Sequence, residues 1–272
     1  MLSEPIFEIG PFKFHMYGFM VAVGVAAALF ILYYFGKKKN VSEKFLDFVF
    51  YNTLAAVLGG FGSAALFQAT YDYIENPANG FDISEGITFI GGLIGGVALF
   101  LIVYFIMRRK LKGRVLDILS YAPACITVAH AFGRIGCLFA GCCHGSPTDA
   151  WYGIYMHTAE YGYAKVVPTQ LFEALYLFAL CAIIFILVMK WDFKHGMSLY
   201  LIAYGIFRFA IEYARSDDRG ALVLGISPSQ FWSILMVVFG IGLIFFVHYF
   251  WKKRKENAEP QAIESEQKEN ET

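Results

Sequence analysis

The feature that most constrains this chain is a series of apolar runs, each long enough to cross a membrane. A transmembrane helix needs roughly 17–25 mostly apolar residues. Backbone groups in lipid must be bonded within their own segment, so such runs form helices. Seven runs meet this length, near 14–35, 45–69, 87–107, 117–140, 171–189, 197–214 and 230–251. The sequence therefore predicts an all-α polytopic membrane protein with seven transmembrane helices.

Basic residues alternate between the loops and orient these helices. Clusters of lysine and arginine follow the first, third, fifth and seventh runs, whereas 70–86 has none and 141–170 has only Lys165. The positive-inside rule then places the N-terminus outside and the C-terminus in the cytoplasm. The first run follows Glu4 and Glu8 without a basic segment, so it is expected to be a span and not a cleavable signal.

Composition excludes two classes of protein. Charged residues make up 16% of the chain, against about 25% in a soluble protein, so a large soluble helical protein does not fit. Basic residues gather only in loops that flank the membrane, and nucleic-acid binding is therefore not expected.

The chain is expected to consist of one membrane domain and a tail. Residues 1–253 hold the seven runs, and the segment 141–170 between the fourth and fifth is predicted to be an external loop, arm or small head. Residues 254–272 are polar and acidic, which predicts a disordered cytoplasmic tail.

Polar side chains within the apolar runs fall at one depth. At 1.5 Å per residue, Arg134 lies about 25 Å, His130 about 20 Å and Arg208 about 18 Å from the cytoplasmic side. A charge that faces lipid at such a depth costs a few kcal/mol at least. Other polar or glycine positions reach the same level from the outer side: His15, Tyr17, Gly91, Gly92, Gln170, Glu173, Tyr204, Glu212, Ser227 and Gln230.

Two arginines at this level indicate an anionic ligand. A guanidinium is permanently charged and its donors match a phosphate, so a phospholipid headgroup is the expected anion. A structural alternative stands for Arg208, because Glu212 lies at i+4 on the same helix. Arg134 has no carboxylate at that spacing and has His130 at i−4. Tyr17 and His15 also suit a membrane-interface position.

The segments that carry these residues resemble a known family. They read IGPFKFHMYG (9–18), GITFIGGLIGG (86–96), GRIG (133–136) followed by Gly145, PTQLFEA (168–174), YGIFRFAIEYAR (204–215) and ISPSQFWS (226–233). In this order, over nearly the whole chain, they resemble the bacterial prolipoprotein diacylglyceryl transferases.

The resemblance implies a reaction, partners and a location. The family moves the diacylglyceryl group of phosphatidylglycerol to the lipobox cysteine thiol of a prolipoprotein, forming a thioether and releasing glycerol phosphate. It implies a multi-pass enzyme of the bacterial cytoplasmic membrane, with its site toward the outer leaflet. The expected partners are phosphatidylglycerol, lipobox peptides and the lipid bilayer, and no cofactor or metal is expected.

The predicted site follows from the resemblance and from the polar cluster together. Arg134 and Arg208 match the family's essential arginines, whereas Tyr17, Gly145 and Tyr204 match other important positions. The residues predicted to be catalytic are Arg134, Arg208, His130 and Tyr17. Those predicted to bind substrate are Arg134, Tyr204, Glu212, Gly145, His15, Gln170, Glu173, Gly91 and Gly92.

The chain departs from the family pattern in three places, of which one is Cys142–Cys143, where an acidic residue is usual. Many members have a histidine, a proposed base, where this chain has Ile90, and an asparagine where it has Cys137. Isoleucine cannot accept a proton, so we predict that His130 replaces that base. The alternative is that His130 makes a structural hydrogen bond to another helix. The departures also leave room for a second function, a lipid-binding or differently acting paralogue.

Four residues, Cys137, Cys142, Cys143 and His144, follow the arginine in the pattern C-x4-C-C-H. The usual CxxC spacing of zinc sites is missing, so a metal site is disfavoured. A disulfide among the three cysteines is a stronger alternative on an oxidising face, and small packing residues around a turn are the favoured interpretation. A solute transporter is a third class of function, but it lacks support because no internal repeat is visible.

Overall fold

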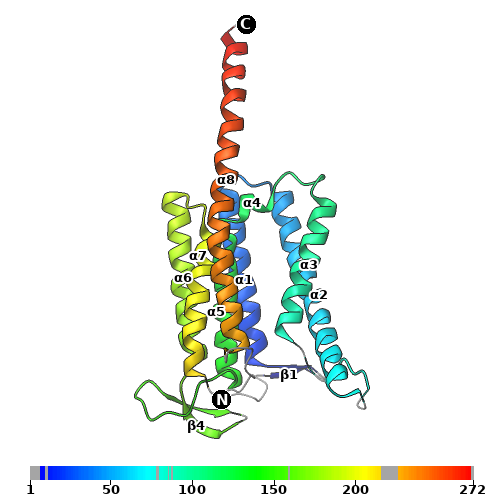
Figure 1. Cartoon of the computed structure of the whole chain (residues 1–272), viewed down its shortest axis with the longest axis vertical. Coiled ribbons are helices and arrows are strands. Elements are labelled where there is room, and N and C mark those ends of the chain that lie inside the picture. The colour runs from blue at the N-terminus through cyan, green and yellow to red at the C-terminus, as the bar shows by residue number, and fades with distance from the viewer. Residues whose placement is uncertain are drawn as a thin grey trace. The chain divides into compact units, whose positions relative to one another are not determined.

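The computed structural model describes residues 7–9, 12–77, 80–84, 86, 88–158, 160–215 and 226–270, with the backbone alone for 7–14, 89–90 and 254–270. Most of these residues are helical (Figure 1). They divide into two compact units, one of Met1–Ile31 with Leu119–Thr272 and one of Leu32–Ile118. The boundary between the units falls within the first helix.

The first unit is a helical bundle. It contains the first part of α1 (Met16–Lys38), α5 (Ala122–Ala140), α6 (Thr169–Trp191), α7 (Gly196–Ile211) and α8 (Pro228–Asn270). Helix α5 packs against α6, and α7 packs against α8. Figure 1 shows α7 and α8 side by side. The buried side chains between them are mainly small or aliphatic, including Ala124, Ala131, Leu177 and Ile184.

Prolines and glycines set where these helices begin and end. Proline fits the first turn of a helix, where its missing N–H has no partner to lose. Pro123 lies in the first turn of α5, Pro168 precedes α6 and Pro228 begins α8. Helix α5 ends at Gly141, whose φ of 71° is left-handed and suits glycine.

Two antiparallel hairpins correct the prediction of an all-α fold. Strand β1 (Phe7–Ile9) pairs with β2 (Phe12–Phe14), and β3 (Ile154–Thr158) pairs with β4 (Gly162–Val166). In β3, Met156 and Thr158 are buried while Tyr155 and His157 point the other way, the alternation typical of a strand. The second hairpin lies within 141–170, the segment for which an external loop or small head is predicted.

The second unit contains the last part of α1, α2 (Glu43–Glu75), α3 (Phe89–Met107) and α4 (Val115–Ile118). Helices α2 and α3 approach closely through small residues. A Cβ atom on Gly60 would lie 3.0 Å from the carbonyl oxygen of Gly92, and Ser63 Oγ donates a hydrogen bond of 2.9 Å to the carbonyl of Gly91. The glycine motif in α3 thus permits close helix contact.

Five of the described helices are long and apolar enough to cross a membrane: α1, α2, α5, α6 and residues 228–253 of α8. Residues 91–107 of α3 form a shorter apolar helix, and α7 has 16 residues. Large apolar side chains such as Leu58 and Phe245 are exposed by 73% and 72%, as lipid-facing side chains are. The chain is a mostly helical, multi-pass membrane protein.

Two predicted boundaries differ from the structure. The run 117–140 is broken, because the short helix α4 ends at Ile118 and α5 begins only at Ala122, next to Pro123. The backbone of α8 continues as a helix to Asn270, where a disordered tail is predicted. Glutamate, glutamine, lysine and alanine are good helix formers, so this polar segment can extend a helix. In the predicted external segment 215–229, residues 216–225 lie outside the described residues.

Candidate active site

A buried ion pair between two helices is the centre of the polar cluster. Arg134 on α5 and Glu173 on α6 approach to 3.1 Å between Nε and Oε1. The Glu173 side chain is 1% exposed and that of Arg134 is 19% exposed. The sequence places no carboxylate near Arg134 on its own helix, and the partner comes from the neighbouring one. A charge this deep needs a counter-ion, and Glu173 supplies it.

Tyr204 and His130 complete this cluster around the same carboxylate. The Tyr204 hydroxyl, on α7, donates a hydrogen bond of 2.7 Å to Glu173 Oε1. Arg134 Nε also donates to His130 Nε2 at 3.3 Å, and His130 Nε2 lies 3.6 Å from Glu173 Oε1. The rings of His130 and Tyr204 meet edge to face at 5.2 Å. Three helices therefore contribute to one buried network.

The contacts of Arg134 with the described residues involve only one of its three nitrogens. All its hydrogen bonds and ion pairs to described residues use Nε. A guanidinium has five N–H donors, so the two terminal nitrogens have no protein partner among those residues. Glu173 Oε2 is buried and also lacks a hydrogen-bond partner there. The cluster thus presents a partly exposed, oriented fork of donors, which suits an anion.

Arg208 differs because its terminal nitrogens are occupied. Nη1 donates to Glu212 Oε2 at 2.6 Å and Nη2 donates to Ser229 Oγ at 2.9 Å. Ser227 Oγ donates to the other oxygen of Glu212 at 2.8 Å. This confirms the i+4 pairing with Glu212, and it connects the end of α7 to the start of α8. Arg208 lies one turn from Tyr204 and acts electrostatically on His130.

Tyr17 lies beside the GRIG segment. A Cβ atom on Gly136 would lie 2.9 Å from Tyr17 Cδ2 and 3.4 Å from its Cα, so the absence of a side chain at 136 lets α1 approach α5. Tyr17 is 47% exposed and interacts electrostatically with Arg134 and the three nearby cysteines. His15, just before α1, is exposed.

Gly145 and Gln170 have structural contacts. The Gly145 N–H donates to the carbonyl of Val167 at 2.8 Å, and a Cβ atom there would collide with the carbonyl of Ala214. That carbonyl belongs to the 3-10 turn η2 (Glu212–Ala214). Gln170 is fully buried and its Nε2 donates to the carbonyl of Cys142 at 2.9 Å. Both residues fix the loop after α5, and their contact with substrate stays a prediction. Contact of Gly91 and Gly92 with substrate also stays a prediction, and these two residues belong to the second unit.

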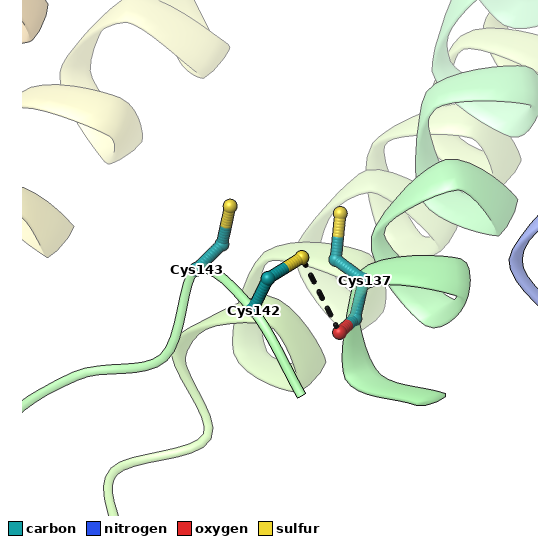
Figure 2. Close-up of side chains that lie close together, drawn as sticks. All are labelled: Cys137, Cys142 and Cys143. Atoms are coloured by element: carbon teal, nitrogen blue, oxygen red, sulfur yellow. Dashed lines mark hydrogen bonds between the residues drawn. The ribbon is translucent and has the colours of Figure 1, made fainter. Parts of the chain in front are cut away.

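The three cysteines after Arg134 converge. The sulfur atoms of Cys137, Cys142 and Cys143 all lie within 4.8 Å of one another (Figure 2). Hydrogen bonds with Cys137 and Cys142, together with the charges of Arg215 and Arg134, lower the pKa of the Cys143 thiol. His144 is apart from this group, because its Nδ1 contacts its neighbour's carbonyl at 2.9 Å. The sequence pattern alone did not reveal this convergence, since it depends on the turn at 141–143.

Comparison with known proteins identifies the family of this chain. The sequence model of one family, described as prolipoprotein diacylglyceryl transferase, matches residues 4–246. The chain belongs to this family. Its sequence is 31% identical over 259 residues to a phosphatidylglycerol–prolipoprotein diacylglyceryl transferase of Clostridium tetani, covering 93% of this chain and 100% of that protein.

Other family members are similarly close. The enzyme named phosphatidylglycerol–prolipoprotein diacylglyceryl transferase 2 of Clostridium perfringens is 34% identical, over 93% of this chain and 97% of its own length. The Methylococcus capsulatus enzyme is 32% identical over 90% and 97%. The resemblance predicted from the motifs is therefore confirmed.

The buried ion pair predicts a large effect of removing its carboxylate. Glu173→Gln keeps the side-chain shape and leaves the Arg134 charge without its counter-ion, so the free energy of unfolding should fall by about 3 kcal/mol. Glu160→Gln is the matched control, because Glu160 is exposed and should change stability by less than about 0.5 kcal/mol. Both are measured by denaturant unfolding in detergent micelles. Equal stability of the two variants would show that the pair is not a structural constraint.

Proposed function

We propose that this chain transfers the diacylglyceryl group of phosphatidylglycerol to the lipobox cysteine of prolipoproteins, the first step of lipoprotein lipidation. Membership of the family over residues 4–246 supports this, as do relatives whose names state the reaction. The structural observation that carries it is Arg134, whose terminal nitrogens are oriented by Glu173 and have no protein partner among the described residues.

The reaction needs charge stabilisation where Arg134 lies. The thiolate of the lipobox cysteine attacks the glyceryl carbon that bears the phosphate. A carbon–sulfur bond forms, the carbon–oxygen bond breaks, and glycerol phosphate leaves with the electron pair. Negative charge then grows on the phosphate, and a pre-oriented guanidinium stabilises it more in the transition state than in the substrate.

Arg208 contributes its charge to the same site, held in place by Glu212 and Ser229. Tyr204 restrains the Glu173 carboxylate, and the half-exposed Tyr17 faces the bound lipid or peptide. His15, Gly145 and Gln170 complete the proposed surroundings of the substrates. Substrate contact by Gly91 and Gly92, which belong to the second unit, stays a prediction of its own.

Replacing either arginine by lysine tests the anion site. Arg134→Lys keeps a positive charge but loses the planar fork that faces the anion. Arg208→Lys keeps its charge but loses the two bonds to Glu212 and Ser229 that hold that charge in place. Each should lower kcat/KM by more than about 100-fold. The assay is mass spectrometry of a lipobox peptide incubated with purified enzyme and phosphatidylglycerol. Arg109→Lys is the control, because Arg109 is exposed after α3 and should retain activity. Near-normal turnover in Arg134→Lys would contradict the proposed clamp.

The differently acting paralogue remains the second candidate because Ile90 and Cys137 replace the residues usual in the family. The wild-type protein in the same assay separates the two. Absence of any lipidated peptide, with folded protein and retained phosphatidylglycerol binding, would favour the paralogue.

His130 is predicted to be the base, and its geometry favours a positioning role beside it. Nε2 accepts a hydrogen bond from Arg134, so the lone pair that a base needs is engaged by a cation. We therefore expect His130→Gln, whose amide oxygen can accept the same bond, to keep at least about one-tenth of kcat. His130→Ala should lose more than about 100-fold. Equal, large losses in both variants would instead support His130 as the base.

The proposed topology has seven spans, an external N-terminus and a site toward the outer leaflet of the bacterial cytoplasmic membrane. The alternation of basic loops supports it. A reporter enzyme active only outside the membrane should be active when fused within 141–170 and inactive when fused within 108–114. The opposite pattern would overturn the orientation.

A further inference from the structure

We propose that Cys137, Cys142 and Cys143 form a three-thiolate site for Zn²⁺ whose fourth coordination position takes the thiol of the lipobox cysteine. This rests on the proposed function, because it names how the transferase holds its second substrate. The sequence pattern alone disfavours a metal here, because the usual CxxC spacing is missing.

The arrangement of the sulfur atoms is the first observation. All three lie within 4.8 Å of one another. Zinc–sulfur bonds of about 2.3 Å in a tetrahedral site place the sulfurs about 3.8 Å apart, so a shift of about 1 Å or less closes the site. In Figure 2 the Cys142 sulfur points toward Cys137, and the sulfurs of Cys137 and Cys143 point to the same side.

The loop that carries two of these thiols is held in place by buried side chains. Thr169 Oγ1 donates a hydrogen bond of 2.8 Å to the carbonyl of Cys143, and Gln170 Nε2 donates one of 2.9 Å to that of Cys142. Thr169 and Gln170 are 1% and 0% exposed. Cys142 N–H also bonds the carbonyl of Cys137 at 3.2 Å.

The backbone of Cys143 is strained. Its φ of 62° is left-handed, a conformation that costs a residue with a side chain of the order of 1 kcal/mol or more. A packing residue gives no reason for such a cost, and glycine would remove it. This left-handed turn accompanies a Cys143 sulfur that lies within 4.8 Å of the other two.

The charges around the site favour an anionic zinc–thiolate group. Zn²⁺ with three thiolates carries a net charge of −1. Arg134 and Arg215 both interact electrostatically with Cys143, and they offset that charge.

The site leaves one position for a substrate. Zinc sites that have three protein ligands keep the fourth position for water or substrate. Among the described residues the group contains the three cysteines and no fourth ligand. His144 does not supply one, since its ring lies against Tyr161 and its Nδ1 contacts the Gly145 carbonyl.

Zinc coordination would supply the nucleophile without a side-chain base. A thiol that binds Zn²⁺ does so as the thiolate, with its proton released to water. The bound sulfur then attacks the glyceryl carbon, the carbon–oxygen bond breaks, and glycerol phosphate leaves toward Arg134. The zinc–sulfur bond to the substrate is released with the thioether product, and no redox change occurs.

The first test is metal binding by the full-length protein in detergent micelles. Purified under reducing conditions, it should contain one zinc per chain by elemental analysis. After exchange with Co²⁺ it should show sulfur-to-cobalt charge-transfer absorption. Cys142→Ser and Cys143→Ser should weaken Co²⁺ binding by more than about 100-fold. Cys125→Ser, whose thiol lies outside the group, should bind as the wild type does.

The second test is binding of the substrate thiol. A lipobox peptide should change the Co²⁺ spectrum, and the same peptide with serine for its cysteine should not. No metal bound by the fully reduced protein, or an intramolecular disulfide among the three cysteines as isolated, would overturn the site. An unchanged spectrum with the cysteine peptide would overturn the open position.

Activity distinguishes this inference from the proposed function. Full lipidation by zinc-depleted protein would overturn the metal site and leave the transferase function intact. Zinc binding with no lipidation of any peptide would support the metal site and overturn the transferase function.

Discussion

The buried pair of Arg134 and Glu173 is the interaction on which the rest of the site depends. A guanidinium at this depth requires a counter-charge, and the carboxylate that supplies it comes from α6. That requirement fixes the rotation of α5 against α6, because both side chains must meet within hydrogen-bond distance. Tyr204 then fixes α7 against the same carboxylate. The same contacts therefore set both the packing of three helices and the orientation of the Arg134 guanidinium.

The end of the bundle that bears the site is organised by a few backbone contacts. Gly141 reverses the chain after α5, and Gly145 lies so close to the carbonyl of Ala214 that a side chain would collide. The β3–β4 hairpin is attached to the same end of the bundle, because Gln170 at the start of α6 contacts Met156 of β3 at 3.8 Å. Arg208 holds the end of α7 against the start of α8 through its bonds to Glu212 and Ser229.

Much of this was predictable from local patterns in the sequence. Apolar length located the helices, and depth along them brought Arg134, His130, Tyr204 and Glu173 to one level. The i, i+4 rule identified the pair of Arg208 and Glu212. The same rule missed the pair of Arg134 and Glu173, because contacts between helices depend on rotations that spacing within one helix does not encode. The convergence of the cysteines was missed for a related reason, since it depends on the left-handed conformation of Cys143. The break in the helix between Ile118 and Ala122 was missed because the residues around it are apolar and continue the predicted run.

Helix α6 holds two parts of the site with residues of its first two turns. Gln170 bonds the loop that bears Cys142, and Glu173, three residues later, bonds Arg134. Three residues of helix rise span about 4.5 Å. The cysteine loop and Arg134 are thus both bonded to α6, so sliding or rotating this helix displaces both together. The relative position of the three cysteines and the Arg134 guanidinium is then a property of one helix.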